Sequence, residues 1–521
     1  MKKIIGALAA LLLAVSGVIP ATADDAYLPE DAPRTGEDTI MFSVSEEGTT
    51  GLSTSVLVAD RSGKGKGTGS WNCDSITDSE CKIPTKADML WGATVFGVCE
   101  TASDINCVES LSIALPGEEM QEAVFVEQPS GIVIPADPKT KYPGGETPTL
   151  WSAPGAPSES GTTDYMVNLR VGGALDPKNL AKTWTFGDLS LNVIPYRVIE
   201  DPSYVAASQG GEENEDGSRH YGIGGNTSEC AWTDNGRCGR QQNFVEGTKV
   251  KVAIRVSKTI GGWFRGRMKD PIINITSLNA EYNRIAVEAQ AVTIQKLNYV
   301  TPREEMTSQE KKYFSESRGP TKYGAGSWYP AAYNGIFDYI AYFKKKVNDT
   351  AAGTNVVWSM GTTQSGRGSK CLSDDDRVLG IVTTNAMGFD GASPAYNKGL
   401  LSYNIGGLHF MPDGETPFEG SYDLVMRSDV ARCLYGFNKA PVSATITVSG
   451  EGDKSIATSI VSEKNGWLKL AAYGFTFSNK TLKVKLTQKK TTITCVTKKK
   501  PIKTKKVTGY SPKCPTGYKK K

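Results

Sequence analysis

The sequence predicts a mainly β protein of two or three β-sandwich-like domains, with a short helical segment between them and a small basic C-terminal disulfide loop. The 521 residues are 39% hydrophobic and 22% charged, as in an ordinary globular protein, and they are too many for one core. Glycine is abundant at 55 residues, and Val, Thr and Ser recur in short alternating runs between turn-forming residues. Helical periodicity is convincing only within residues 301–348.

The chain begins with a pattern typical of a secretory signal peptide. Residues 1–23 combine Lys2 and Lys3, an apolar run over 4–19, and the small-residue ending PATA. Cleavage at this ending starts the mature chain near Asp24. Because no later stretch approaches the ~20 apolar residues that span a bilayer, we expect an exported protein without a transmembrane segment, secreted or associated with the cell surface.

Alternation of polar and apolar residues divides the rest of the chain. We expect an N-terminal β domain over 24–127, where 39–45 and 53–60 resemble a hairpin and 91–99 and 107–115 resemble two strands tied at a shared end. Seven prolines in 128–163 indicate a linker or an extended loop. A middle β domain is expected over 164–300. Eight short strand candidates then predict a C-terminal β-sandwich domain over 349–488.

Residues 301–348 carry the two predicted helices. The first opens at Thr301, with Pro302 and Glu304 at the positions of a capping box. The second has a hydrophobic stripe that we expect to pack on a sheet, formed by Tyr333, Ile336, Phe337, Ile340, Phe343 and Val347.

The ten cysteines predict five disulfides formed in an oxidising compartment. Three pairs share a C-x7-C spacing around turn-forming residues, so the two sulfurs of each pair can meet across a short loop. The simplest connectivity is sequential: Cys73–Cys81, Cys99–Cys107, Cys230–Cys238, Cys371–Cys433 and Cys495–Cys514. Metal binding is the alternative, but the pairs lack the C-x2-C spacing and histidine partners of zinc sites. We expect neither a metal nor a cofactor.

Positive charge is concentrated in a basic tail, residues 489–521. This segment has no acid and 12 lysines: Lys489, Lys490, Lys498, Lys499, Lys500, Lys503, Lys505, Lys506, Lys513, Lys519, Lys520 and Lys521. Without them and the two lysines of the signal, residues 24–488 hold 45 basic and 56 acidic residues, a net charge of −11. The contrast predicts a polyanionic partner, either an anionic cell-wall polymer or a lipid surface, and no nucleic acid. A solubilising tail is the alternative, although such a tail needs no crosslink.

The sequence contains no recognisable catalytic constellation. With only His220 and His409, a three-histidine metal centre is excluded, and a Ser-His-Asp triad has to use one of the two. Glycoside hydrolysis needs only two carboxylates. The candidate acids lie in two charged loops and are Glu212, Glu215, Asp216, Asp374, Asp375 and Asp376.

Two aromatic segments supply candidate ligand-binding residues. Rings and guanidinium groups close together can stack on sugars or hold an anion, and the residues of this kind are Trp263, Arg265, Arg267, Trp328 and Tyr329. An ordinary strand with alternating faces is the alternative for both segments. A glycan or protein ligand therefore remains a second kind of partner to consider.

Several segments carry a resemblance to known sequences. The stretches GGWFRGRMKDP, AYNGIFDYIAYFKKKV and SYDLVMRSDVARCLYGF resemble a set of large secreted proteins of actinobacteria that are uncharacterised. The ending TITCV…KKVTGYSPKCPTGYKKK is similar to a short Cys- and Lys-rich C-terminal module on varied exported proteins of that group. The resemblance brings no catalytic residues. It implies an exported, surface-associated protein with an interchangeable basic end.

These observations lead to one leading hypothesis and two alternatives. The leading hypothesis is a secreted, disulfide-stabilised cell-envelope protein, not an enzyme, that acts by binding or scaffolding and is attached to anionic envelope polymers through its basic C-terminus. The alternatives are an extracellular carbohydrate-active enzyme that uses two loop carboxylates, and a glycan-binding adhesin with an exposed aromatic platform.

Overall fold

The computed structural model describes residues 39–45, 54–61, 67–82, 87–176, 183–224, 230–316, 326–363, 369–373, 377–437, 442–450, 458–477, 480–488, 490–498, 501–510 and 512–521. The expected signal peptide lies outside them, as do Asp374, Asp375, Asp376, Lys489, Lys499 and Lys500. The predicted mainly β class is confirmed, with 56% of the described residues in strands and 8% in helices. In this part of the chain no helix is both long and apolar enough to cross a membrane.

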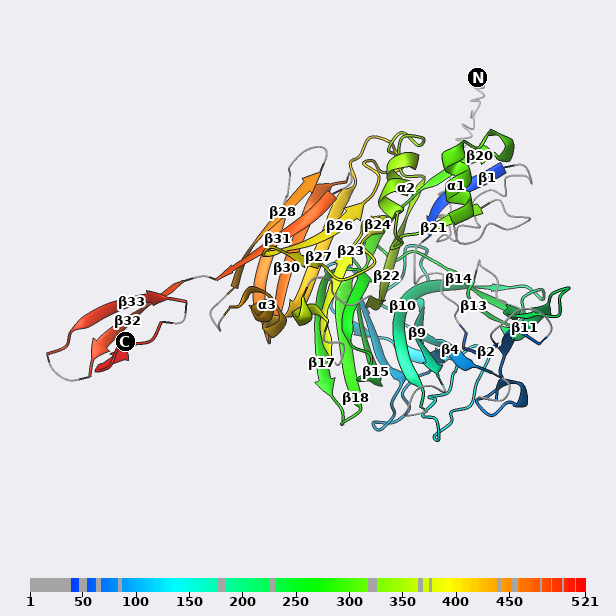
Figure 1. The fold of residues 1–521 in the computed structure, drawn as a ribbon, viewed down its shortest axis with the longest axis horizontal. Helices are drawn as coiled ribbons and strands as arrows, with labels where there is room; N and C mark the ends of the chain where they lie inside the picture. Colours follow the sequence, from blue (N-terminus) through cyan, green and yellow to red (C-terminus); the bar gives the residue numbers. More distant parts are fainter. Residues whose placement is uncertain are drawn as a thin grey trace, which may run out of the picture.

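A long central sheet runs through the middle of the molecule (Figure 1). Its strands follow in the order β12 (Arg219–Gly224), β3 (Gly69–Asn72), β2 (Val56–Arg61), β4 (Met89–Phe96), β9 (Asp164–Leu175), β10 (Thr185–Glu200), β22 (Gly353–Thr363), β16 (Gly262–Arg267), β23 (Val378–Thr384), β27 (Glu419–Arg427), β30 (Trp467–Thr476) and β29 (Thr458–Lys464). Further strands pair at its sides: β11 (Ser208–Glu213), β7 (Val124–Glu127), β8 (Thr149–Ser152), β13 (Cys230–Asp234), β14 (Arg237–Gln241) and β19 (Val292–Lys296).

The central sheet draws strands from all three expected β domains. β2 near the N-terminus and β30 near the C-terminus belong to the same hydrogen-bonded sheet, so the expected boundaries do not separate independent sheets. The expected linker, 128–163, is packed rather than extended, because it contains β8 and the buried residues Ile132, Ile134, Tyr142 and Trp151. Of its seven prolines, Pro129 and Pro148 are buried, whereas Pro135, Pro138 and Pro154 are exposed.

Two smaller sheets cover opposite faces of the central sheet. One consists of β17 (Lys269–Ser277), β18 (Tyr282–Gln290), β15 (Lys249–Ser257), β5 (Cys107–Ala114) and β6 (Gln121–Glu122). The other consists of β24 (Gly388–Phe389), β26 (Leu400–Gly406), β31 (Lys480–Gln488) and β28 (Val442–Gly450), with β25 (Ala395–Asn397) beside β26.

Neighbouring residues of the central strands point into different cores. Phe264 and Val425 belong to the hydrophobic core under the first covering sheet, whereas Trp263 and Leu424 belong to the core under the second. Successive side chains of a strand project to opposite faces, so β16 and β27 are buried on both sides. This explains why β23, with the sequence VLGIVTT, is buried along its whole length.

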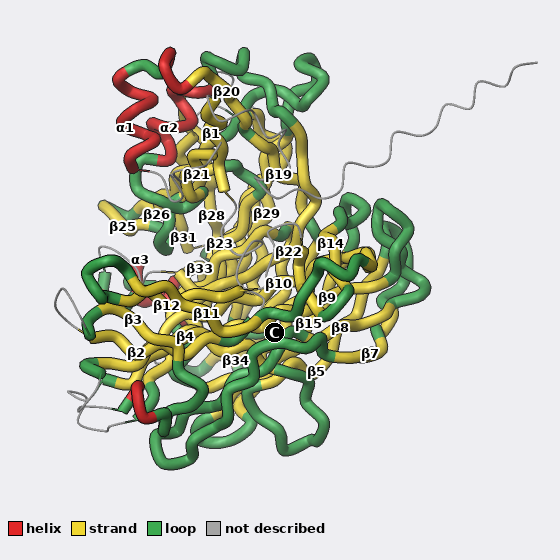
Figure 2. Tube along the Cα trace, turned by 90° about the vertical axis from the view of Figure 1, so that its right-hand side faces the viewer, coloured by secondary structure: helices red, strands yellow, loops and turns green. Residues whose placement is uncertain are grey.

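The two predicted helices lie at one end of the molecule beside a third small sheet (Figure 2). That sheet has the order β20 (Asn298–Pro302), β1 (Thr39–Ser45) and β21 (Gly326–Pro330). Helices α1 (Ser308–Glu316) and α2 (Ile336–Phe343) share a core with it. The expected hairpin of 39–45 with 53–60 is wrong, because β1 pairs with β20 and β21 while β2 joins the central sheet.

Helix α1 begins at Ser308 and not at the predicted Thr301. Thr301 and Pro302 belong to β20, where their backbone pairs with β1, and a turn of 3-10 helix (Arg303–Glu305) follows. A capping box exists, but Thr307 and Glu310 form it: the Thr307 N–H donates to Glu310 Oε2 (2.7 Å), and the Glu310 N–H donates to Thr307 Oγ1 (3.2 Å).

The predicted stripe of α2 is confirmed for its helical core. Ile336, Ile340 and Phe343 are buried, and the helix contacts strands β21, β24 and β26. Tyr333 lies before the helix and its side chain is 47% exposed, whereas Tyr339, which the prediction omitted, is buried. Helix α3 (Ser428–Tyr435), which follows β27, was not predicted.

All five disulfides join the cysteines in the predicted sequential pairs. Cys230–Cys238 crosses the β13–β14 hairpin. Cys99–Cys107 ties the end of β4 to the start of β5, as expected, although the two strands belong to different sheets. Cys371–Cys433 ties a short 3-10 turn (Lys370–Leu372) to α3.

The chain ends in a small sheet that stands apart from the rest of the protein (Figure 1). Its order is β33 (Thr504–Gly509), β32 (Thr491–Thr497) and β34 (Tyr518–Lys520), and the Cys495–Cys514 disulfide lies within it. We call residues 490–521 the C-terminal module.

Candidate functional site

The C-terminal module is an antiparallel sheet built around β32. β33 pairs along one edge of β32, from Thr491↔Gly509 to Val496↔Thr504, and β34 pairs along the other. The β-branched residues of β32, TTITCVT, favour an extended backbone. Cys495, in the centre of that strand, is fully buried and is bonded to Cys514. Because a unit of this size has little core, the crosslink supplies much of its stability.

The lysines of the module project into solvent. All those that the structure describes are exposed: Lys490, Lys498, Lys503, Lys505, Lys506, Lys513, Lys519, Lys520 and Lys521. No acidic side chain occurs in residues 489–521, so the module cannot neutralise these charges by internal ion pairs with side chains. The result is a compact, rigidly crosslinked cation joined to an acidic protein.

The residues predicted to bind a ligand at GGWFRGRMKD mostly lie inside the protein. Trp263 is 0% exposed, and its indole N–H donates to the Leu372 carbonyl oxygen (3.2 Å). Arg267 is 2% exposed, and its guanidinium lies 4.3 Å from the centre of the Phe389 ring. Arg265 is half-buried over the same ring, at 5.6 Å. The prediction of an exposed platform is therefore wrong for Trp263 and Arg267.

Arg267 instead hydrogen-bonds to the backbone of the segment that joins β23 to β24. Its guanidinium donates to the carbonyl oxygen of Thr384 (3.2 Å), the last residue of β23, and to those of Ala386 (2.5 Å) and Met387 (3.3 Å), which follow the strand. A planar guanidinium with five N–H donors can satisfy several carbonyls at once. The charge of Arg267 is thus used to support the chain segment between β23 and β24.

The second aromatic segment is also part of a core. Tyr329 is 3% exposed, and its hydroxyl donates to the Asn334 carbonyl oxygen (2.8 Å). The side chain of Trp328 lies outside the part of the chain that the structure describes. The prediction of an exposed ligand-binding ring is therefore wrong for Tyr329.

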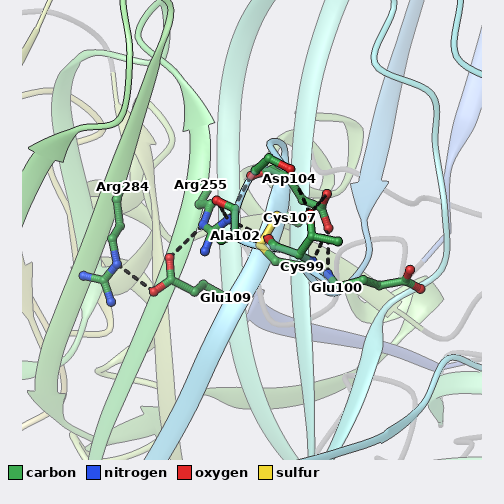
Figure 3. Close-up of a disulfide and its surroundings, with 10 residues drawn as sticks. Cys99, Glu100, Ala102, Asp104, Cys107, Glu109, Arg255 and Arg284 are labelled. Carbon is green, nitrogen blue, oxygen red and sulfur yellow. Dashed lines mark hydrogen bonds and ion pairs between the residues drawn. A yellow bond between two sulfur atoms is a disulfide. The ribbon is translucent and has the colours of Figure 1, made fainter.

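The loop closed by Cys99–Cys107 is held by a half-buried arginine, Arg255 (Figure 3). The Arg255 guanidinium donates to the carbonyl oxygens of Thr101 (3.0 Å), Ala102 (2.9 Å) and Asp104 (3.1 Å). Arg255 also donates to Glu109 (2.8 Å), which accepts a second hydrogen bond from Arg284 (2.8 Å). Burial opposes ionisation of Glu109, but these two arginines outweigh it and lower the pKa of that carboxyl. The network fixes the loop.

The described acids considered for glycoside hydrolysis lie on the β11–β12 hairpin and are exposed. Asp216 accepts hydrogen bonds from the Ser218 hydroxyl (2.6 Å) and backbone N–H (2.9 Å), which lower the pKa of its carboxyl. A general acid needs a raised pKa.

His220 pairs across the same hairpin with Glu212, and His409 Nδ1 lies 3.1 Å from the Phe477 carbonyl oxygen. Within the described residues no group of three or more acids, histidines and cysteines could hold a metal ion.

One buried carboxyl with a raised pKa lies elsewhere, at the corner between sheets. Asp423 on β27 accepts a hydrogen bond from the Tyr473 hydroxyl (2.6 Å) and one from the Asp270 backbone N–H (3.1 Å). Lys469 Nζ lies 3.8 Å from Asp423 Oδ1 and also forms an ion pair with Asp270. Burial raises the pKa of Asp423 to about 6, although Tyr473 and Lys469 oppose the shift. The network joins β27 and β30 to the start of β17, where the chain leaves the central sheet.

No protein-family model matches the chain, and a search of curated proteins finds no significant match.

Proposed function

We propose that the protein is a secreted, disulfide-stabilised envelope protein that acts by binding or scaffolding and is attached to anionic envelope polymers through its C-terminal module. The five disulfides are compatible with an oxidising, extracellular environment. The single observation that carries the proposal is the exposure of every described lysine on a crosslinked module that lacks acidic side chains.

Charge separation supports attachment through the module rather than through the body. Residues 24–488 carry a net charge of −11, and an anionic polymer repels such a surface, whereas the 12 lysines of 489–521 attract it. Each lysine near an anionic surface contributes on the order of 1 kcal/mol. Position matters as well, because the module stands apart from the body and can reach a polymer without bringing the acidic surface against it (Figure 1).

We propose binding rather than catalysis for the same protein. Among the described acids that were considered for glycoside hydrolysis, all are exposed on one hairpin, and the pKa of Asp216 is lowered rather than raised. The described rings that were considered for sugar stacking, Trp263 and Tyr329, are buried. Neither alternative function gains support from these residues.

The experiment compares the cell-bound fraction of the full chain with that of a variant ending at residue 488. We expect the full chain to be retained at 0.15 M salt and released as salt approaches 1 M, because the Debye length falls from about 8 to about 3 Å. The truncated variant should appear in the medium at all salt concentrations. Retention of the truncated variant that is equal to the full chain and insensitive to salt contradicts the proposal.

A charge-neutral control separates electrostatic attachment from a structural need for the module. In this control Gln replaces all 12 lysines of residues 489–521, while Cys495 and Cys514 remain. A non-reducing mass measurement verifies that the disulfide has formed. The control should behave like the truncated variant if charge is responsible, and like the full chain if the module binds by another kind of contact.

A further inference from the structure

We propose that the module binds its polymer through one face of the sheet only, the face opposite the disulfide, and that the ligand is a flexible polymer with repeated phosphate diesters. The inference rests on the proposed function and deepens it by naming the surface and the ligand chemistry. The binding lysines are Lys506, Lys519 and Lys521.

The pairing of strands assigns each lysine to a face. Directly paired residues in an antiparallel sheet project their side chains to the same side. Cys495 is paired with both Lys505 and Lys520, so these two lysines share the side of the disulfide. We call this side the disulfide face. Because successive residues alternate, Lys506 and Lys519 project from the opposite side, which we call the threonine face.

Lys521 extends the threonine face. It follows β34 two residues after Lys519, and its backbone N–H donates to the Thr494 carbonyl oxygen (2.9 Å), which continues the strand pairing. Lys506 is paired with Thr494 from the other side. Lys506 and Lys521 therefore flank β32, with the Thr494 side chain between them.

The disulfide face is used by the module's own core. Cys495 is fully buried, and Ile493, Val507 and Tyr518 are half-buried on the same side of the sheet. The bond to Cys514 places the segment that contains this residue over the same face. A polymer cannot lie flat against a surface that the chain already covers.

The threonine face is polar and open. It carries Thr492, Thr494, Thr504 and Thr508 together with Lys506, Lys519, Lys521 and the half-buried Val496. The hydroxyl oxygens of Thr492 and Thr508 lie 2.7 Å apart in a hydrogen bond. Hydroxyl donors next to ammonium groups are suited to oxyanions, because both kinds of group donate hydrogen bonds to them.

Spacing favours a polymer over a single small anion. Lys506 and Lys521 are two strand spacings apart, about 10 Å, and Lys519 and Lys521 are two residues apart along a strand, about 7 Å. A single phosphate can contact two of these lysines only if their flexible side chains bend toward each other, because their Cα atoms are about 7 to 10 Å apart. A chain with one phosphate diester in each short polyol repeat can place a separate charge near each lysine.

The same face fits lipid and nucleic acid less well. Proteins that lie on a bilayer insert exposed apolar or aromatic side chains. Within the paired strands the apolar member of the threonine face, Val496, is half-buried, and the exposed Ile502 and Tyr510 lie outside those strands, before and after β33. Proteins that bind single-stranded nucleic acid stack bases on aromatic rings. Of the module's two tyrosines, Tyr518 belongs to the disulfide face, and the ring of Tyr510 already has the Lys490 ammonium 5.3 Å from its centre. A phosphate-bearing polymer without bases or acyl chains requires neither kind of contact.

The test compares two charge-matched double variants of the full mature chain. K506Q/K519Q removes two lysines from the threonine face, and K505Q/K520Q removes the sequence neighbours of the same lysines from the disulfide face. The probe is a soluble synthetic poly(glycerol phosphate), titrated at 0.15 M salt. Each lysine near an anionic surface contributes about fivefold in affinity. We expect about 25-fold weaker binding for K506Q/K519Q and less than fivefold for K505Q/K520Q.

The charge-retaining variant K506R/K519R checks that the threonine-face positions tolerate substitution, and it should bind within about threefold of the wild type.

Equal loss of affinity in the two glutamine variants overturns the assignment of the face but leaves the proposed function in place. Binding to phosphatidylglycerol vesicles or a single-stranded DNA oligonucleotide in preference to the polymer overturns the ligand chemistry. Salt-sensitive self-association that blocks polymer binding shows that the module binds the acidic body of a second copy, and this outcome also overturns the proposed ligand chemistry. If the wild type binds no anionic probe, the proposed function fails as well.

Discussion

Removing the Cys495–Cys514 disulfide should unfold the C-terminal module and leave the rest of the protein folded. The bond closes a loop with a sequence separation of 19 residues, and closing a loop of that length stabilises a folded chain by about 3 kcal/mol. Within the described part of the module, Cys495 is the one fully buried apolar side chain. A unit with so little core has no comparable source of stability.

The assay is hydrogen exchange of the β32 and β33 backbone amides in the double variant C495S/C514S, followed by mass spectrometry. A loss of about 3 kcal/mol corresponds to roughly 100-fold faster exchange through opening of the module. Exchange in the central sheet should remain unchanged, because the module stands apart from it (Figure 1). Binding to anionic polymer should weaken in parallel, since an unfolded tail no longer keeps Lys506 and Lys519 on one face.

The matched control removes a disulfide from the body. C371S/C433S should increase exchange near α3 and leave the module protected. Module amides of C495S/C514S that keep wild-type protection would refute the argument, because the sheet would then be stable without its crosslink.

Three further predictions concern the body of the protein. Because burial raises the pKa of Asp423 to about 6, the folded protein binds this proton more tightly than the unfolded protein. The free energy of unfolding should therefore fall by roughly 3 kcal/mol as pH rises from about 3 to about 7, and then level off. Urea unfolding across this range should show the free energy of unfolding of the wild type falling relative to that of D423N by that amount. A difference between the two proteins that does not change with pH contradicts the assignment. Trp263→Ala should destabilise the protein by about 3–5 kcal/mol in the same assay, because the side chain is fully buried in one of the two cores; the half-exposed Tyr333→Ala serves as its control and should cost much less. Thr307→Ala should remove about 1 kcal/mol from helix α1, measured as faster amide exchange there, whereas Thr301→Ala should not act through a helix cap.

Local features of the chain were predictable because their partners are close in sequence. The pairs Cys73–Cys81, Cys99–Cys107 and Cys230–Cys238 each close eight positions apart, so spacing alone indicated them. The hydrophobic stripe through Ile336 and Phe343 likewise follows from helical periodicity.

Features that depend on distant partners were predicted less well. A capping box was expected at Thr301, but the backbone of that residue pairs with β1 more than 250 positions earlier, and the helix therefore starts after Thr307. Trp263 and Arg267 had the composition of a ligand platform, yet covering strands from residues 388–488 enclose that part of the sheet. Composition cannot distinguish a stacking surface from a core when the covering segment lies far along the chain.

The sequence by itself determined the mainly β class, the pairing of the cysteines and the contrast between an acidic body and a basic end, since each depends on residue type or on short spacing. Only the tertiary structure decided that strands of all three expected domains join one central sheet and that lysines adjacent in sequence, such as Lys505 and Lys506, project from opposite faces of the module. The physical reason is that sheet pairing and burial are settled between segments far apart in the chain, where alternating residues show which side chains share a face but not what covers it.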